Sequence, residues 1–335
     1  MNFKIIEIQI TTEPSRIDQA LLEALRKQAP EISRNTLKSW FQDQKIYFAG
    51  RTVKAALTLA PGEYEIEIRD LAPAALGKAQ ASASLQTDQI RIAYEDDHLL
   101  VLNKDSGTPS VPHNPSETET AVGLALAHYP ALANIGRNVL EPGLLHRLDT
   151  GTSGLLVFAK SQTEFERLSA AWKKREVEKV YRAWVSPTTP HSPDTTLQLP
   201  LRIDTPLAHD AKSARRMVAC RESSRTAIRG KPLPAVTHLI SLHSKISCSP
   251  PLSDIYISDL EIRIETGVMH QIRCHLASLD YPIVGDPIYK GLKSPRLWLH
   301  AWRLSLSTSD GKILNLEADL PTNWKSVSFT PPIKS

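Results

Sequence analysis

The segment with the clearest chemical potential is HRLDTGTSG at residues 146–154, which runs directly into the apolar stretch 155–159. It places Arg147 and Asp149 two residues apart. In an extended chain both side chains would therefore point to one face, while Leu148 points to the core. The Thr, Gly and Ser residues that follow predict a tight loop, where reactive side chains are commonly held by a rigid scaffold. The pattern thus predicts a cation and a carboxylate presented together.

Spacing alone leaves the function of this pair open. An Asp beside an Arg is most often a solvated ion pair that contributes roughly 0 to 1 kcal/mol. The loop lacks the Gly-Lys-Ser/Thr ending of a phosphate-binding loop, and the stretch from Gly151 to Gly154 is one residue short of G-x-S-x-G. Neither a nucleotidase nor a serine hydrolase is supported.

The composition sets wider bounds on the function. The 335 residues, 41% hydrophobic and 23% charged, can bury a full-sized core divided between two domains. The formal charge of +4 permits a polyanionic partner without requiring one. Cys220, Cys248 and Cys274 are far apart and form no C-x-x-C pair, which argues against a zinc site and a disulfide framework. With no signal peptide or membrane-spanning run evident, we expect a cytoplasmic protein without metal.

The first part of the chain predicts a small α+β unit. Alternating residues at the N-terminus indicate a strand, and helical spacing from Ile17 to Leu25 indicates a helix. A second helix is expected at about 33–44. Strand and turn signals follow at 45–53, and the alternating EYEIEIR predicts the last strand.

Beyond this unit the pattern changes twice. An Ala- and Ser-rich stretch with no strong periodicity predicts a linker, and strands, turns and a few helices then alternate irregularly. This irregularity favours an α+β fold with a mixed, mainly antiparallel sheet over a doubly wound sheet. The expected boundaries are residues 1–70 for the small domain, 71–88 for the linker, 89–325 for the large domain and 326–335 for a tail.

HRLDTGTSGLLVFAK resembles the signature of the RluA-type pseudouridine synthases. Four further blocks, in family order and approximate spacing over about residues 90–307, extend the resemblance: IAYEDDHLLVLNKDSG, EKVYRAW, TGVMHQIRCHLASLDYPIVGDPIY and RLWLHAWRL. The resemblance implies the pseudouridine synthase fold. It also implies an isomerase that converts uridine to pseudouridine in structured RNA, with no cofactor.

The resemblance also implies roles for particular residues. Asp149 would be the catalytic carboxylate, Arg273 would pair with it, and Tyr181 would pack on the target uracil. Arg147 would enter the stack that the flipped base vacates. An arginine partner is chemically coherent because its guanidinium keeps a carboxylate ionised and oriented.

Three more residues are candidates for substrate contact. His270 and Gln271 precede Arg273 at the start of an expected helix, whose polar first turn would suit an anionic ligand. For His270 a capped surface helix is an equally good interpretation. Lys104 could approach a substrate phosphate or merely cover the end of a strand.

The implied reaction breaks the N-glycosidic bond, turns the base and rejoins it through carbon 5. A carboxylate can serve this cycle by attacking the anomeric carbon or by removing a neighbouring sugar proton, and the sequence does not choose between these routes. A retaining glycosidase needs a second acid about 5 Å from the first, whereas uracil leaves with its charge delocalised.

The chain departs from the family pattern in a few places. Lys104 is followed by Asp105 instead of Pro, and the TGR-type triplet reads Thr-Gly-Val with Val268 in third place. The usual substrate contacts near Val268 are therefore in doubt. Segments 221–230 and 244–258 look longer than typical, and we expect surface loops there that could alter RNA choice.

Residues 14–70 resemble, more loosely, a small RNA-binding domain named after a ribosomal small-subunit protein. The stretches that begin at Arg16, Ser33 and Ala49 carry this likeness. Arg34 and Lys38 are spaced i,i+4, so together they could line a phosphate-binding face or a merely solvated one. A tethered second contact of this kind would raise the effective concentration on a large RNA.

The leading interpretation is a monomeric pseudouridine synthase that acts on ribosomal RNA, with transfer RNA as the alternative substrate. An inactive RNA-binding or ribosome-assembly factor belongs to a different class, and the presence of Asp149, Tyr181 and Arg273 disfavours it. A retaining glycosidase lacks an evident second acid and leaves the small domain unexplained.

Overall fold

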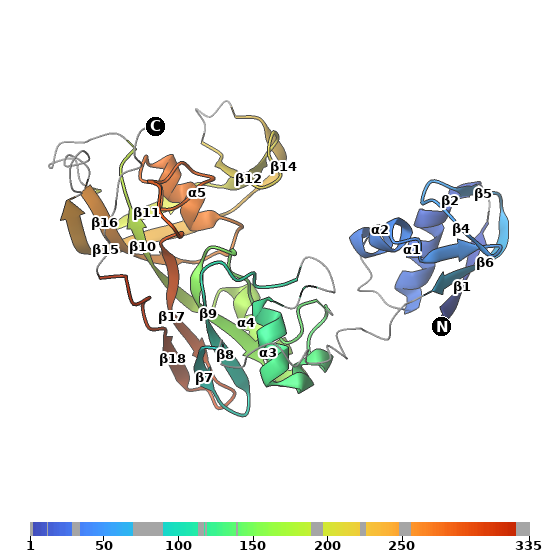
Figure 1. Cartoon of the computed structure of the whole chain (residues 1–335), viewed down its shortest axis with the longest axis horizontal. Coiled ribbons are helices and arrows are strands. Elements are labelled where there is room, and N and C mark those ends of the chain that lie inside the picture. Colours follow the sequence, from blue (N-terminus) through green and yellow to red (C-terminus); the bar gives the residue numbers. More distant parts are fainter. Residues whose placement is uncertain are drawn as a thin grey trace. The chain divides into compact units, whose positions relative to one another are not determined.

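The computed structural model describes residues 3–11, 13–28, 34–69, 90–112, 117, 119–138, 140–188, 197–221, 226–247 and 256–325. The chain forms two compact units, one drawn from residues 1–81 and 137–139 and the other from residues 82–136 and 140–335 (Figure 1). The expected linker, the expected tail and Cys248 lie outside the described residues.

The first unit is a four-stranded sheet of order β1-β6-β3-β4 with two helices and a short β2–β5 pair. Its elements are β1 (Phe3–Ile10), β2 (Ser15–Arg16), α1 (Ile17–Gln28), α2 (Arg34–Gln42), β3 (Ile46–Phe48), β4 (Arg51–Thr52), β5 (Thr58–Leu59) and β6 (Gly62–Arg69). Ile8 of β1, Leu21 of α1 and Ile66 of β6 are almost fully buried in one core. The helices and strands expected from the periodicity are confirmed.

The second unit is built on one large sheet of order β11-β15-β16-β10-β17-β9-β8-β7, with β18 paired to β17. Its strands are β7 (Ile92–Glu95), β8 (Leu99–Lys104), β9 (Ser153–Ala159), β10 (Glu178–Val185), β11 (Leu201–Asp204), β12 (Leu207–Asp210), β13 (Met217–Ala219), β14 (Ile228–Leu233), β15 (Val236–Ser247), β16 (Tyr256–Ile264), β17 (Leu299–Ser307) and β18 (Ile313–Glu317). Its helices are α3 (Ala121–His128), the 3-10 turn η2 (Pro130–Asn134), α4 (Gln162–Lys174) and α5 (Gln271–Ser278).

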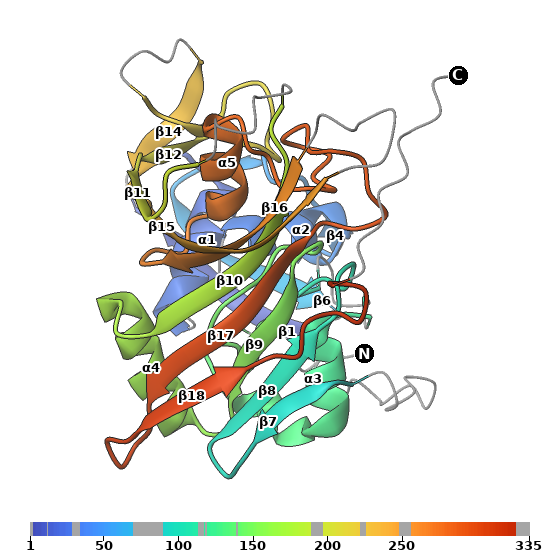
Figure 2. The same ribbon diagram turned by 90° about the vertical axis from the view of Figure 1, so that its left-hand side faces the viewer.

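Among the described strands, only the β9–β17 pairing is parallel, so the expected mainly antiparallel sheet is confirmed. Figure 2 shows β10, β17, β9 and β8 side by side. β12, β13 and β14 form a separate three-stranded sheet. No described helix has the length and apolar character needed to cross a membrane.

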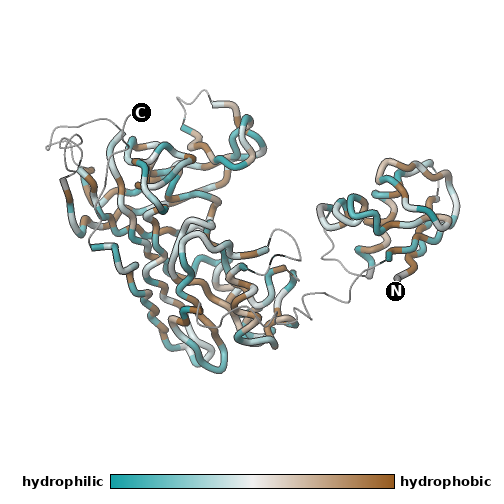
Figure 3. The backbone as a smooth tube through the Cα atoms, viewed as in Figure 1, coloured by the Kyte–Doolittle hydropathy of each residue, from teal (hydrophilic) through white to brown (hydrophobic). Residues whose placement is uncertain are grey.

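The centre of the large sheet is apolar and tightly packed. Every residue of β9 is buried, as expected for a strand covered on both faces, and Figure 3 shows hydrophobic residues recurring along these strands. Gly154 has a φ of +112°, and a Cβ there would collide with the backbone of Ala301 on β17. Glycine therefore permits the close approach of β9 to β17 directly after the Asp149 loop.

The two longer segments differ from the expected loops wherever the structure describes them. Residues 228–230 begin β14, and residues 244–247 continue β15 in pairing with β16 as far as Ser247 and Tyr256. These parts extend strands because they continue the neighbouring backbone pairing. The segments 222–225 and 248–255 lie outside the described residues.

Candidate active site

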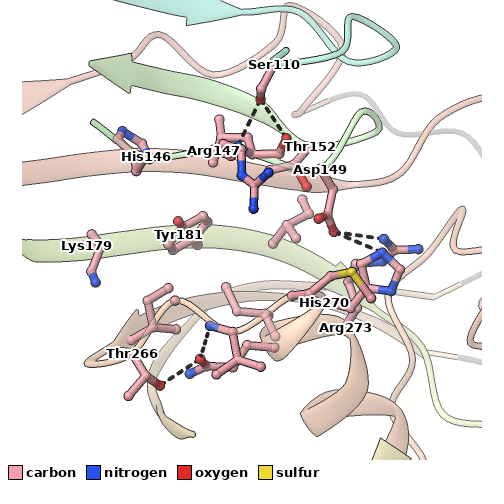
Figure 4. Close-up of a pocket in the computed structure, with 18 of the residues that line it drawn as sticks. Ser110, His146, Arg147, Asp149, Thr152, Lys179, Tyr181, Thr266, His270 and Arg273 are labelled. Atoms are coloured by element: carbon pink, nitrogen blue, oxygen red, sulfur yellow. Dashed lines mark hydrogen bonds and ion pairs between the residues drawn. The ribbon is translucent and has the colours of Figure 1, made fainter. Parts of the chain in front are cut away.

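A cleft of about 1560 Å3 opens along the second unit and contains the HRLD segment. One wall comes from residues 144–152, the floor includes Tyr181 of β10, and the opposite wall comes from residues 264–273. Figure 4 shows Tyr181 between the Arg147 and Asp149 segment and the Thr266 to Arg273 segment. The fold thus brings together three blocks that are distant in sequence.

Main-chain and side-chain hydrogen bonds fix the loop that carries Asp149. Ser110 accepts from the Leu148 amide at 3.0 Å and donates to the Leu148 carbonyl at 2.7 Å. The Gly107 amide donates to the Thr150 carbonyl at 2.8 Å. Leu148 is buried, as expected, so the residues on either side of it project toward the cleft.

Arg273 lies between two carboxylates. Its Nη1 donates to Asp149 Oδ2 at 2.8 Å, while Nε and Nη2 donate to the two oxygens of Asp286 at 2.7 and 3.0 Å. Asp286 is fully buried, whereas the Asp149 side chain is 26% exposed toward the cleft. Burial alone would lower the pKa of Arg273, but the hydrogen bonds that it donates to Asp286 and the charges of both carboxylates outweigh burial and raise that pKa. The guanidinium is therefore a permanent, fixed cation beside Asp149.

His270 is the second basic group near Asp149. Its Nε2 lies 3.8 Å from Asp149 Oδ2, and its Nδ1 lies 3.3 Å from the Tyr289 hydroxyl. It precedes α5 in the left-handed conformation, with a φ of +55°. Burial lowers the pKa of His270, and the Asp149 charge opposes that change. The imidazole therefore faces the carboxylate instead of capping the helix.

Tyr181 lies on β10 between Ile262 of β16 and Ala301 of β17. It is 8% exposed and lines the cleft. Burial and then the Asp149 charge raise the pKa of the Tyr181 phenol, so it stays protonated at neutral pH. The result is a fixed, uncharged aromatic surface on the floor of the cleft.

Arg147 and Asp149 line the same cleft but make different contacts. The Arg147 side chain is 67% exposed, and its Nη1 lies 3.4 Å from Glu141. An exposed pair of this kind is weak. Arg147 is therefore free to move toward a bound ligand.

Two of the candidate substrate-binding residues, Gln271 and Lys104, are buried, and their polar groups form hydrogen bonds within the protein. Gln271 accepts from Thr266 and from the Val268 amide, and its Nε2 donates to the Val236 carbonyl and to Thr237. The Lys104 ammonium donates to the carbonyls of Asp105, Thr108 and Thr150 at 2.7 to 3.2 Å. Gln271 thus fixes the turn before α5, and Lys104 fixes the base of the Asp149 loop.

Burial lowers the pKa of Lys104 to about 7, although the charges of Asp149 and Asp105 oppose this change. Asp105, which departs from the family pattern, faces outward and lies 3.5 Å from Arg91. Val268, the other departure, packs with Cys274 and Tyr289 in an apolar cluster. At position 268 the chain therefore has an apolar contact in place of a cation.

The candidate residues of the first unit are exposed. Arg16 is paired with Asp18 at 2.9 Å, and Arg34 and Lys38 lie on α2 with solvent-exposed side chains. These residues form a candidate surface of the first unit.

Two residues of the site were missed at the level of sequence, Asp286 and Ser110. Asp286 stands in the GDPIY part of a resembling block, so the block was noticed but its carboxylate was not. Ser110 carries no recognisable local pattern. Among the described residues, no cluster of three or more His, Cys, Asp or Glu side chains could hold a metal ion.

The arrangement presents one ionised, partly exposed carboxylate beside a fixed guanidinium, above an aromatic ring, in an open cleft. Such a carboxylate can act as a nucleophile or a base on a ligand that packs against the ring. The openness of the cleft suits a polymer that enters from solvent.

Comparison with known proteins agrees with this geometry. Residues 98–278 match the family model for RNA pseudouridylate synthase. The chain is 28% identical over 291 residues to ribosomal large subunit pseudouridine synthase D of Escherichia coli K12, covering 87% of this chain and 78% of the relative. It is 30% identical over 327 residues to the protein of the same name from Nitrosomonas europaea, covering 93% and 83%.

The fold is also found among solved structures. Human RNA pseudouridylate synthase domain containing 1 superposes with a TM-score of 0.56 at 22% identity, covering 75% of this chain and 92% of that one. The expected pseudouridine synthase fold is confirmed by this similarity.

Proposed function

The chain belongs to the RNA pseudouridylate synthase family and is therefore an isomerase that acts on RNA, and from this premise we propose that Asp149 is its catalytic carboxylate and ribosomal RNA its substrate. Arg273 holds Asp149 in place, and Tyr181 packs on the target uracil. Arg147 fills the space that the flipped base leaves. The single observation that supports this assignment best is the 2.8 Å contact of Arg273 with Asp149 in the cleft that also contains Tyr181.

The chemistry follows from the ionised state of Asp149. A base within folded RNA must be unstacked before a side chain reaches its sugar, which costs a few kcal/mol and is offset by stacking on an aromatic ring. Tyr181 offers that ring. Asp149 then attacks the anomeric carbon or removes the neighbouring sugar proton, and in either case the bond from the anomeric carbon to N1 of uracil breaks. Uracil turns, and carbon 5 bonds to the anomeric carbon as the carboxylate leaves it or as the sugar proton is returned. Carbon 5 then loses its own proton and N1 takes one up.

The arrangement around Arg273 supports a carboxylate that is oriented toward the ligand at the start of the cycle and is regenerated at its end. Nη1 is the only Arg273 nitrogen bonded to Asp149, because Nε and Nη2 are bonded to Asp286. One oxygen of Asp149 is thus bound by Arg273, which leaves the second for the sugar. His270, 3.8 Å away, is placed to accept or return a proton near the reacting carbons.

Ribosomal RNA is the substrate that the relatives' names favour, since both relatives described above are named for the large ribosomal subunit. Residues 1–70 would act as a small RNA-binding domain, joined by a linker at 71–88 to a catalytic domain at 89–325. Arg16, Arg34 and Lys38 would supply its phosphate contacts. We further propose a cytoplasmic monomer that uses neither metal nor cofactor, with transfer RNA as the alternative substrate.

Tritium release from 5-tritiated uridine in RNA tests the proposal. RNA prepared from cells that lack the protein is incubated with the wild type and with Asp149→Ala, and the tritium released from carbon 5 is followed. We expect release by the wild type and a loss of at least about 10²-fold in the variant. Sequencing the modified positions separately in ribosomal and transfer RNA identifies the substrate. Release that is unchanged in Asp149→Ala would overturn the catalytic assignment.

A further inference from the structure

Lys179 is a buried cation in the wall of the same cleft, and it has no partner among the residues that the structure describes. It lies on β10 two residues before Tyr181 and is only 7% exposed. It lines the cleft, and it makes no hydrogen bond or ion pair with any residue that the structure describes. Lysine is almost never buried to this degree unless it is paired. Within the described part of the chain, the ammonium therefore lacks the counter-charge that its burial requires.

Among the described residues, the charged side chain that acts on Lys179 is another cation, Arg175. Burial lowers the pKa of Lys179, and the charge of Arg175 lowers it further. Burial and the charge of Lys179 lower the pKa of His146 to about 3, so that imidazole is neutral and cannot act as a competing cation. Glu265 also lines the cleft, but its carboxylate is bound by His238 at 2.7 Å. Within the described residues, no carboxylate pairs with Lys179.

Arg175 adds a second, exposed cation beside Lys179. It follows α4 in the left-handed conformation with a φ of +64°, where glycine is the usual residue. A non-glycine residue is strained there, and its side chain lines the cleft. Trp172, one turn earlier, stacks on His146 with 5.2 Å between ring centroids and closes this end of the site.

We propose that Lys179 and Arg175 form a phosphate-binding subsite for the nucleotide that adjoins the target uridine. The proposal rests on the proposed function. Lys179 and Tyr181 are two residues apart on one strand, so they share a face and are about 7 Å apart along it. An anion at Lys179 would thus lie about one nucleotide away from a base packed on Tyr181. Burial strengthens such an ammonium–phosphate contact relative to one in water.

The subsite is tested with Lys179→Met, which keeps the length of the side chain and removes its charge. The matched control is Lys174→Met, which removes a lysine charge from the end of α4. The Lys174 side chain is 70% exposed, and its Nζ lies 4.0 Å from Glu176. RNA from cells that lack the protein is bound to each variant at several salt concentrations. We expect roughly tenfold weaker binding by Lys179→Met and a salt slope of log K smaller by about 0.7, the value for one phosphate of a single strand.

Thermal stability separates a binding role from a structural one. Removal of an unpaired buried charge should leave the melting temperature of Lys179→Met unchanged or raised. A lowered melting temperature with unchanged RNA affinity would make Lys179 a structural residue and overturn the proposal.

Two further outcomes keep the proposals distinguishable. If Lys179→Met binds RNA with the affinity and salt slope of the control, the subsite is rejected, even if wild-type tritium release still supports the proposed function. If the wild type releases no tritium but the salt slope of RNA binding is smaller for Lys179→Met than for the control, the subsite stands and the proposed function fails. Inorganic phosphate alone is the last probe, and its effect on the melting temperature is measured. If phosphate raises the melting temperature of the wild type but not of Lys179→Met, and the substitution leaves RNA binding unchanged, the site binds a free anion. The assignment of the site to RNA is then wrong.

Discussion

Asp286 binds Arg273 through both Nε and Nη2, at 2.7 and 3.0 Å, and so leaves Nη1 to Asp149. Asp286 also accepts from the amides of Ile288 and Tyr289. The guanidinium that orients the proposed catalytic carboxylate is thus itself fixed by a fully buried acid that has no access to substrate.

Asp286→Asn should therefore impair both stability and catalysis. Loss of one charge of a buried pair leaves Arg273 partly uncompensated, and we expect about 3 kcal/mol of destabilisation in urea denaturation. With the protein fully folded, kcat for tritium release should fall by roughly 10 to 100-fold and KM should change less, since positioning is altered and RNA contact is not. A fall in stability with kcat intact would show that Asp286 serves the fold alone.

The same relationship predicts that Arg273→Lys is not a conservative change. Lysine keeps the charge but lacks the planar fork that reaches both carboxylates. Its effect on kcat should be non-additive with that of Asp286→Asn in a double-mutant cycle, because both act on one contact. Additive effects would indicate that the two residues act independently.

Tyr181→Phe and Tyr181→Leu separate the ring from the hydroxyl. Stacking of a base on an aromatic ring contributes about 1 to 3 kcal/mol. In an Asp149→Ala background, Tyr181→Phe should bind RNA within about twofold of its parent. Tyr181→Leu should bind roughly 5 to 150-fold more weakly. Equal affinities for the two variants in filter binding would argue against a stacking surface.

Lys104 predicts a specific pH dependence of stability. Its pKa is about 7 in the folded protein against 10.5 for an ordinary lysine, so between these values the unfolded chain binds more protons than the folded one. Stability therefore rises with pH across this window, by up to about 1.4 kcal/mol per pH unit, and the destabilising effect of the buried charge is full below pH 7. The difference in unfolding free energy between the wild type and Lys104→Met should accordingly move in favour of the wild type between pH 7 and pH 9. Parallel stability curves for the two proteins would contradict the shifted pKa.

Gly154→Ala should destabilise the protein through a collision, and Gly311→Ala provides the matched control. Both glycines have positive φ, +112° and +80°, but a Cβ at Gly311 meets nothing within 4 Å, whereas one at Gly154 collides with Ala301. We expect the control to lose about 1 to 2 kcal/mol from backbone strain alone. Gly154→Ala should lose clearly more, measured by urea denaturation. Similar losses in both variants would mean that β9 can move away from β17 at little cost.

Much of the fold and the position of the central loop could be predicted from the sequence, because local patterns carry that information. Alternation and helical spacing mark the elements of the first unit, and the buried Leu148 between two outward side chains follows from extended geometry. The HRLD motif and the resembling blocks indicated that Asp149, Tyr181 and Arg273 would meet.

The contacts that were not predicted depend on groups distant in sequence. A lysine after a strand and a glutamine at a helix start look like ligand-binding residues. Lys104 instead donates to nearby carbonyls and to that of the distant Thr150, and Gln271 also donates to the distant Val236 carbonyl. Asp286 is a missed partner for the same reason, since nothing near it shows that Arg273 faces it. Segment 244–258 was expected to be a loop, because the pairing of β15 with β16 cannot be predicted from composition alone.

The order of strands in the large sheet has a consequence for biosynthesis. β17, formed by residues 299–307, lies between β10 and β9, so a central strand is translated after every other described strand of the large sheet except β18. A ribosome-bound chain that ends before β17 would have two half-sheets with exposed apolar edges, which favours delayed folding and chaperone capture. The second unit should therefore complete its large sheet only after residues 299–307 have left the ribosome, and truncations that remove β17 should yield insoluble material instead of a smaller enzyme.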